Sequence, residues 1–360
     1  MIAEIKHERP GVYSSYEASG LTAASAGGGK VAVIAVVDEP ENMEDVYQWT
    51  SYSKAAADVG DCTLSRLAQL AIRNGAGTVY GVPVKSVEDD DGESYKAAYK
   101  AAFAVAAAIE DVAVAVCDST KLEVQQELRE MVETCSAARK ERIAVVGGAA
   151  NEGVTALVDR AAKLNCERVV LVAPGGVDAD GKAVGGAMCA AAVAGAIAGT
   201  TDPALPLGGA QLYGLTGLEQ SYDDDEIDAL VQGGVTALET LAGACYVVRG
   251  VTTRTKTGEA KDATWRELTT ILVVDEVIPG LRNALRSKFS RAKNTEQTRG
   301  AIRSQTVMEL EKRVSREIID SYEDVTVSAL EDDPTVCLVE FAFTVAHGLN
   351  QVWLSAHITV

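Results

Sequence analysis

Short apolar runs alternate with stretches of helical periodicity between residues 30 and 200. The apolar runs are rich in Val, Ile and Ala, which is typical of strands buried on both faces. They occupy residues 31–37, 78–84, 112–117, 143–146 and 168–173. Apolar positions recur at helical spacing in residues 63–74, 94–109, 121–138, 154–164 and 187–198. This alternation predicts an α/β domain with a mostly parallel sheet covered by helices on both faces.

The pattern changes after residue 200. Residues 201–243 contain prolines, paired glycines and an acidic run, which together predict connecting loops with short helices. Two strand-like runs follow at 245–253 and 264–274, on either side of a hairpin-like turn at 256–258. The second part of the chain therefore begins with β structure.

Two helices are predicted next. The first should begin near Pro279, because proline is tolerated in the first turn of a helix. Its apolar stripe consists of Ile278, Leu281, Leu285 and Phe289. The second should begin at a capping motif of Asn294 and Gln297, and its buried positions are Val307, Leu310, Val314 and Ile318. Further strand-like runs at 324–329, 335–346 and 351–360 make this an α+β region.

Charge narrows the choice of partners. The 360 residues have a formal net charge of −19, so bulk electrostatics oppose binding to nucleic acid or to an anionic membrane surface. The first residues contain acids and bases rather than an apolar signal segment, and the apolar stretch 187–200 is too short to span a bilayer. Seven cysteines without a CxxC pair favour a reducing compartment. We therefore expect folding in a cytoplasm.

Motifs for catalysis or cofactor binding are weak. The three histidines, His7, His347 and His357, lack a convincing nucleophile pattern, and Gly-x-Ser-x-Gly is absent. The glycines before Lys30 precede a strand, whereas a phosphate-binding P-loop follows one. The glycine-rich segment 147–153 stands where a dinucleotide-binding turn would be, but it lacks the glycine spacing. A nucleotide- or metabolite-binding α/β enzyme remains the alternative function.

Acidic clusters offer a second kind of candidate site. Residues 178–181 resemble the start of a calcium loop, but the downstream bidentate Glu is missing. The Asp runs 89–91 and 223–225 could bind a metal, although solvated loop tips are the simpler interpretation. We therefore expect no metal, no cofactor and no catalytic residue.

One stretch of the acidic chain is strongly basic. Between Leu281 and Ser304, the local charge is about +6, and Glu296 is the only acid. The seven cations are Arg282, Arg286, Lys288, Arg291, Lys293, Arg299 and Arg303. They could pair internally with acidic loops, or they could form a docking face for an acidic partner.

Three segments carry a resemblance to a known family. The first is Pro10-Gly11-Val12-Tyr13 near the start, and the second is the small-residue helix end at 194–200 with the loop after it. The third is the ordered set Thr252-Thr253-Arg254, Trp265-Arg266-Glu267-Leu268, Val274-Asp275 and Lys293-Asn294-Thr295. With these segments in this order, the chain resembles the contractile tail sheath proteins of phages and related injection systems, including R-type bacteriocins.

The resemblance implies a function for the whole chain. Sheath subunits form rings that stack into a helical polymer around an inner tail tube and contract without nucleotide hydrolysis. Expected partners are further copies of the chain, the inner tube protein, and baseplate and tail terminator proteins. The expected location is a virion tail or a bacteriocin-like particle assembled in the bacterial cytoplasm. The basic stretch is then the candidate tube-facing patch.

The resemblance also implies a domain layout. Residues 1–29 would be an N-terminal arm, 30–240 an outer α/β domain, 241–350 an inner α+β domain next to the tube, and 351–360 a C-terminal strand arm. The arms would add strands to neighbouring subunits. The residues proposed for these contacts are Pro10, Gly11, Val12, Tyr13, Val352, Leu354, His357, Ile358 and Val360. The chain leaves little room for the large outer insertions of many sheath subunits.

Overall fold

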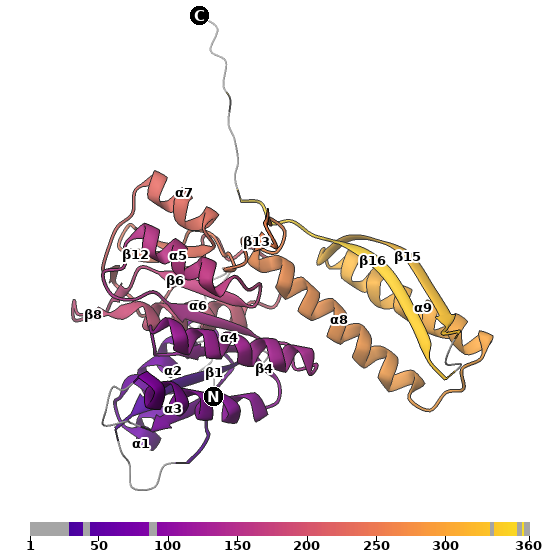
Figure 1. The fold of residues 1–360 in the computed structure, drawn as a ribbon, viewed down its shortest axis with the longest axis horizontal. Coiled ribbons are helices and arrows are strands. Elements are labelled where there is room, and N and C mark those ends of the chain that lie inside the picture. The colour runs from indigo at the N-terminus through magenta and orange to yellow at the C-terminus, as the bar shows by residue number, and fades with distance from the viewer. Residues whose placement is uncertain (1–28, 39–43, 86–91, 332–334, 351–354, 356–360) are drawn as a thin grey trace, which may run out of the picture.

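The computed structural model describes residues 29–38, 44–85, 92–331, 335–350 and 355. Figure 1 shows two parts. The first is a thick α/β body, formed by the described residues between 29 and 267. The second, which extends sideways from the body, comprises two long helices and a β-hairpin between residues 268 and 346, and is called the helix–hairpin unit below.

The body is built around a nine-stranded sheet of described residues with the strand order β2-β3-β1-β4-β5-β6-β11-β12-β9. The six strands from β3 to β11 pair in parallel, whereas the pairs at both ends of the sheet are antiparallel. The strands are β1 (Lys30–Val37), β2 (Tyr47–Trp49), β3 (Thr78–Lys85), β4 (Val112–Cys117), β5 (Ile143–Gly147), β6 (Val169–Ala173), β9 (Gln211–Leu212), β11 (Val235–Leu241) and β12 (Ala244–Val247).

Helices cover both faces of this sheet, because each parallel strand is apolar on both sides. In β1, Val31 and Val33 face one core, and Ala32 and Ile34 face the other. The first core is closed by α1 (Tyr52–Val59), α2 (Thr63–Arg73) and α6 (Gly185–Gly199). The second is closed by α3 (Gly92–Ala108), α4 (Leu122–Ala137), α5 (Val154–Leu164) and α7 (Asp224–Gln232). The predicted α/β fold with a mostly parallel sheet is confirmed.

Small residues allow α6 to pack tightly under the sheet. A Cβ atom on Gly195 would lie 2.3 Å from the backbone oxygen of Ala71 in α2, and one on Gly147 would lie 2.1 Å from the backbone of Gly186. The Gly- and Ala-rich sequence of α6 therefore serves close backbone packing.

Short strands complete the body. β7 (Gly176–Val177), β8 (Ala183–Val184) and β10 (Gly217–Leu218) form a small sheet, and β13 (Lys256–Thr257) pairs with β14 (Ala260–Lys261). The second pair is the hairpin-like turn expected near residues 256–258. No helix among the described residues is long and apolar enough to cross a membrane.

The helix–hairpin unit has a core of its own. Its elements are α8 (Leu268–Phe289), α9 (Glu296–Ser315), β15 (Ile319–Ala329) and β16 (Cys337–Val345). Val277 and Leu281 of α8 pack with Leu310 of α9 and with Ile319 and Val325 of β15. The side chain of Thr295 caps α9 by accepting a hydrogen bond from the amide of Thr298, one residue later than the predicted capping motif.

Two predictions from local pattern were wrong. Residues 264–274 were expected to be a strand, but α8 begins at Leu268, and Pro279 lies inside it rather than in its first turn. The β-branched run favours a strand locally. As a helix, however, it buries Leu268 and Ile271 in the first core of the body and Val273 in the core of the helix–hairpin unit. Tertiary packing therefore decides the structure of this segment.

The second error concerns residues 201–243, expected to be loops and short helices. α7 is such a helix, but β11 is a strand of the main sheet, paired in parallel with β6. The hydroxyl of Thr236 in β11 exchanges hydrogen bonds with the backbone of Val251, which satisfies this polar group inside the core. The predicted domain boundary at 240 falls within β11, and the division into an outer and an inner domain stays a prediction.

Candidate functional site

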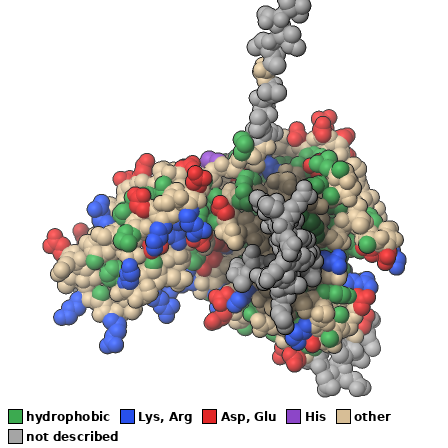
Figure 2. Space-filling model, turned by 180° about the vertical axis from the view of Figure 1, so that it is seen from behind, with side chains coloured by type: hydrophobic (Ala, Val, Ile, Leu, Met, Phe, Trp, Pro, Cys, Tyr) green, Lys and Arg blue, Asp and Glu red, His purple; other side chains and the backbone are tan. Residues whose placement is uncertain are grey.

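The basic stretch begins in the outer half of α8, where Arg282 and Arg286 face the body, and continues through the turn into α9 at the far end of the helix–hairpin unit (Figure 1). Figure 2 shows Lys and Arg side chains spread over this unit, with acidic side chains on both the unit and the body. We call the seven cations of residues 282–303 the basic corner. Its members differ in how they are held.

Four members make internal contacts. Arg282 forms an ion pair with Glu141 of the body, with Nη1 2.8 Å from Oε1. Lys288 donates to Gln305, Arg299 to Asn294, and Arg303 to the backbone oxygen of Val325. Of these four, Arg282 is the one that pairs with an acidic side chain of a described residue, as the internal-pairing interpretation expects, and it helps to attach the unit to the body. Lys288, Arg299 and Arg303 bond neutral groups instead.

The other three members are free to meet a partner. Arg286, Arg291 and Lys293 are exposed, and no described residue forms a hydrogen bond or ion pair with their side chains. Three exposed cations near one another in the sequence of an acidic chain create a local positive potential. The docking interpretation is thus best supported for these three residues.

An apolar strip lies beside the basic corner. Leu330, Val336 and Leu338 at the far end of the β15–β16 hairpin are about two fifths exposed. The side-chain amide of Asn294, next to Lys293, donates to the backbone oxygen of Val336 at 3.2 Å. Positive charge and exposed apolar surface therefore adjoin, a combination found at protein–protein interfaces.

The hairpin offers strand edges. In the described part of the chain, β15 and β16 pair only with each other, so each strand has an outer edge whose backbone groups no other described strand covers. One face carries Phe341, Phe343 and Val345, which pack against the core of the helix–hairpin unit, whereas the opposite face is exposed. Such edges can accept a strand from another chain.

The residues proposed as intersubunit arms lie outside the described residues. These are Pro10, Gly11, Val12, Tyr13, Val352, Leu354, His357, Ile358 and Val360. The Asp run 89–91 and two of the three histidines also fall outside them, while His347 is exposed just after β16. The role of the arms stays a prediction.

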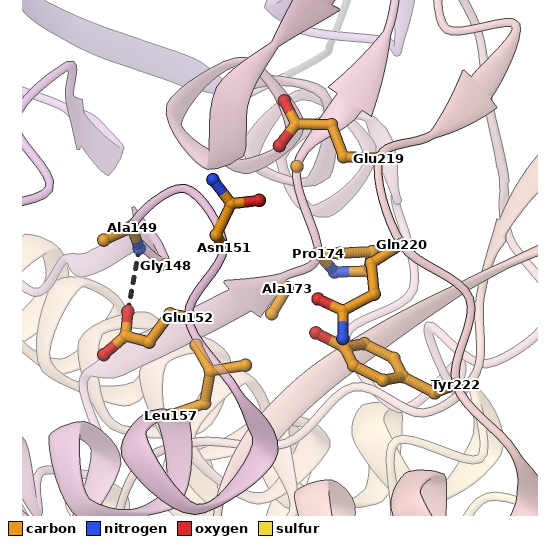
Figure 3. Close-up of a pocket in the computed structure, with 11 residues that line it drawn as sticks. Gly148, Ala149, Asn151, Glu152, Leu157, Ala173, Pro174, Glu219, Gln220 and Tyr222 are labelled. Atoms are coloured by element: carbon orange, nitrogen blue, oxygen red, sulfur yellow. Dashed lines mark hydrogen bonds between the residues drawn. The ribbon is translucent and has the colours of Figure 1, made fainter.

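The place suggested for a dinucleotide turn is the end of β5 and the start of α5. A cavity of about 30 Å³ lies there, at the carboxyl ends of β5 and β6 (Figure 3). It has room for a water molecule or two, far less than a nucleotide needs. Gly147 fits the backbone of α6 closely, which accounts for this glycine through packing.

The charges around this cavity also oppose a phosphate. Glu152 points its carboxylate at the backbone amide of Ala149, 2.8 Å away, where a phosphate oxygen would bind (Figure 3). Arg160 pairs with Glu152 at 3.0 Å, and a second carboxylate, Glu219, also lines the cavity. The protein's own carboxylate therefore uses the anion-binding amide of this turn.

The remaining acidic candidates have structural roles. Asp178 accepts hydrogen bonds from the amides of Asp180 and Lys182, which shapes a surface turn. Asp223 and Glu226 form a capping box at the start of α7. No cluster of three or more potential metal ligands occurs among the described residues.

Comparison with known proteins gives a consistent family. A model of the phage tail sheath protein central domain matches residues 91–253, and a model of the phage tail sheath C-terminal domain matches residues 260–359. The tail sheath protein of Bacillus phage SP01 is 25% identical over 253 residues, which cover 69% of this chain and 43% of that protein. The chain thus spans less than half the length of this curated relative.

Solved structures share the fold at low sequence identity. A chain of the anti-feeding prophage baseplate has a TM-score of 0.73 and 14% identity, with 99% of this chain and 100% of that chain covered. The anti-feeding prophage helical sheath in its contracted state has a TM-score of 0.70 and 14% identity, with coverage of 98% and 99%. Because the two family models together match most of the sequence, we conclude that the chain belongs to the phage tail sheath protein family.

Proposed function

We propose that this chain is the structural subunit of a contractile tail sheath. Copies of it polymerise helically around an inner tail tube and contract, without nucleotide hydrolysis, to drive the tube through a target cell envelope. The family membership and the shared fold with a contracted helical sheath support this function. Assembly takes place in the bacterial cytoplasm, and the product is a virion tail or a bacteriocin-like particle.

The observation that carries the proposal is the two-stranded sheet at one end of the molecule. Its two outer edges are open to strands from other copies, and the arms at residues 1–29 and 351–360 are the candidate donors. Contacts of this head-to-tail kind build open helices rather than closed dimers. Backbone hydrogen bonds between neighbours can persist while the bodies rotate, which lets the lattice shorten without coming apart.

The basic corner is the proposed tube-facing surface. Arg286, Arg291 and Lys293 meet an acidic tube surface, and the adjoining apolar strip adds contact area. Exposed charge pairs are each worth only about 0–1 kcal/mol. Such modest contacts suit a surface that must let go of the tube during contraction. The other proposed partners are baseplate and tail terminator proteins.

We further propose that the chain is not an enzyme. The energy of contraction is stored when the extended lattice assembles on the tube and baseplate, as in other bistable switches. The acidic lining of the cavity beside Glu152 and its small volume support a body that serves as a rigid block. Nucleotides should leave the melting temperature unchanged, whereas a nucleotide-binding enzyme would be stabilised.

Negative-stain electron microscopy in nucleotide-free buffer tests the proposal. The purified protein alone should form hollow striated cylinders, and the protein mixed with its tube protein should form sheathed tubes. Particles that stay small and uniform in both samples would contradict a self-assembling sheath.

A further inference from the structure

Helix α8 leaves the core of the body after its first two turns. Leu268, Ile271 and Leu272 pack against the body. Val273 already belongs to the core of the helix–hairpin unit, and so do Val277 and Leu281 further along α8. The loop after α6 adds local support near the start of α8, because Ala204 joins the unit's core and Pro206 touches Gly348. Apolar packing between the two parts is therefore concentrated around the start of α8 and this loop.

Among the described residues, two ion pairs hold α8 to the body, one at the end of its second turn and one further along the helix. Arg168, which directly precedes β6, donates from both terminal nitrogens to the carboxylate of Asp275, at 2.7 and 2.9 Å. The two side chains are only 13% and 18% exposed. One and a half to two turns further along, Arg282 pairs with Glu141 through a single 2.8 Å contact, and its side chain is 34% exposed. A bidentate, buried pair is the stronger and less salt-sensitive of the two.

Open space lies on both sides of these pairs. A cleft of about 950 Å³ separates Pro279 and Asn283 of α8 from Asp111 and Lys140 of the body. A second hollow of about 430 Å³ lies beside Ile278. Glu141 and Asp275 line both spaces, so among the described residues the two ion pairs bridge α8 and the body between two open volumes.

From this geometry we propose that α8 is a braced hinge. The helix–hairpin unit pivots about the first two turns of α8 and the loop near Pro206. The Arg168–Asp275 pair stays closed and defines the pivot. The Arg282–Glu141 pair is a releasable brace that fixes the angle between the helix–hairpin unit and the body. When the brace opens, the unit swings into the cleft, where the unpaired Arg286 approaches Glu110 and Asp111 on the opposite wall.

The hinge is a property of the single subunit, so it can be tested whether or not the chain polymerises. In an assembly it would set the angle between the basic corner and the body. Failure of the sheath proposal would leave the hinge intact, and failure of the hinge would leave a rigid sheath subunit.

Distance measurements between spin labels test the hinge in the full, unassembled chain. Labels carried by non-canonical amino acids at Asp159 in α5 and Met308 in α9, both exposed, leave the native cysteines untouched. With the Arg282–Glu141 ion pair unaltered and at low salt, the two labels should give one narrow distance distribution. Glu141→Gln, or about 1 M salt acting on the unaltered chain, should shift the mean distance and widen the distribution about twofold.

Two further variants make the test specific. Glu141→Arg combined with Arg282→Glu reverses the brace and should restore the narrow distribution at low salt. Asp61→Asn removes the exposed Arg66 pair elsewhere in the body and should change nothing. An unchanged distribution in Glu141→Gln and at high salt would overturn the proposal, as would equal widening by Asp61→Asn. The salt series needs no substitution at the brace, so a misfolded variant cannot decide the outcome.

Discussion

The seven cations of the basic corner look alike in the sequence, but their side chains make different contacts. Arg282 reaches a carboxylate 141 positions away in the sequence, and Arg303 caps a backbone oxygen of the next strand. Arg286, Arg291 and Lys293 remain exposed. Reversing Arg282 would therefore weaken the attachment of the helix–hairpin unit as well as any contact with a tube, which makes it a poor probe of docking.

Charge reversal at the three exposed cations is the sharper test of docking. Arg286→Glu, Arg291→Glu and Lys293→Glu together should weaken binding to the tube at least about tenfold, or about 1.4 kcal/mol, because several attractive contacts become repulsive. Co-sedimentation with preformed tubes measures this loss. The melting temperature should change little, because no described residue depends on these side chains.

A matched variant separates local docking from net charge. Lys163→Glu, Lys182→Glu and Lys261→Glu change the charge equally, at exposed positions of the body. Tube binding should be kept in this variant. Equal loss in both triple variants would show that only total charge matters, and retention in both would remove the basic corner from the tube contact.

Glu309 gives α9 a pH-dependent contribution. Its hydrogen bond with Lys312, helped by Arg313, lowers the pKa of Glu309 below its ordinary 4.5. A lowered pKa in the folded state means that the ionised carboxylate stabilises the fold above pH 4.5, and that this stability is lost as the pH falls through the lowered value. Glu309→Gln should thus reduce the melting temperature at neutral pH and weaken its decline in acid.

Thermal melts between pH 7 and pH 3 check this difference. Glu259→Gln, at an exposed turn position without an ion pair among the described residues, is the control and should follow the unaltered protein. Parallel melting curves for Glu309→Gln and the unaltered chain at every pH would refute the assigned contribution.

At the scale of elements, substituting glycines in helices tests how closely two helices pack. Gly195→Ala would place a methyl group 2.3 Å from the backbone of Ala71, so α2 and α6 would have to separate. We expect the free energy of unfolding to fall by about 1–3 kcal/mol or more, measured by denaturant titration. Gly300→Ala in α9 meets no atom within 4 Å and should stabilise by about 0.5–1 kcal/mol. Loss of stability in both variants would reject this packing argument.

The parallel sheet could be predicted from sequence because its strands are short, apolar and β-branched on both faces. Two elements could not be predicted in this way. The start of α8 is β-branched but sits between two cores that a helix can reach at once. β11 carries a buried Thr236, whose hydroxyl finds its partners inside the core on the backbone of Val251, 15 positions away. In both cases long-range packing outweighs local propensity.

The candidate site could be predicted only in part, because it too depends on long-range contacts. A run of seven cations with one acid predicts, from sequence alone, either internal pairing or a docking surface. Which of them stay exposed depends on partners such as Glu141 and Val325, and no spacing rule links these to the basic corner. The apolar strip at Leu330 and Val336 also comes into view only when the hairpin brings it beside Asn294.

At the scale of the whole molecule, assembly should depend on segments beyond the hairpin. Deleting residues 351–360 should abolish polymer formation and leave the subunit folded, because the strand donated to a neighbour is lost. Sedimentation velocity measures the polymer, and circular dichroism measures the fold. Polymers of normal length from the shortened chain would argue against the C-terminal arm as a connector.

The central claim is that copies of this chain surround a tube with the helix–hairpin unit inward and the α/β body outward. A helical reconstruction of the protein assembled on its tube by cryo-electron microscopy tests it directly. The account predicts a continuous helical lattice in which α8 and α9 lie at the smallest radius, with Arg286, Arg291 and Lys293 against the tube. A lattice with the body against the tube, or closed oligomers that leave the tube bare, would contradict it.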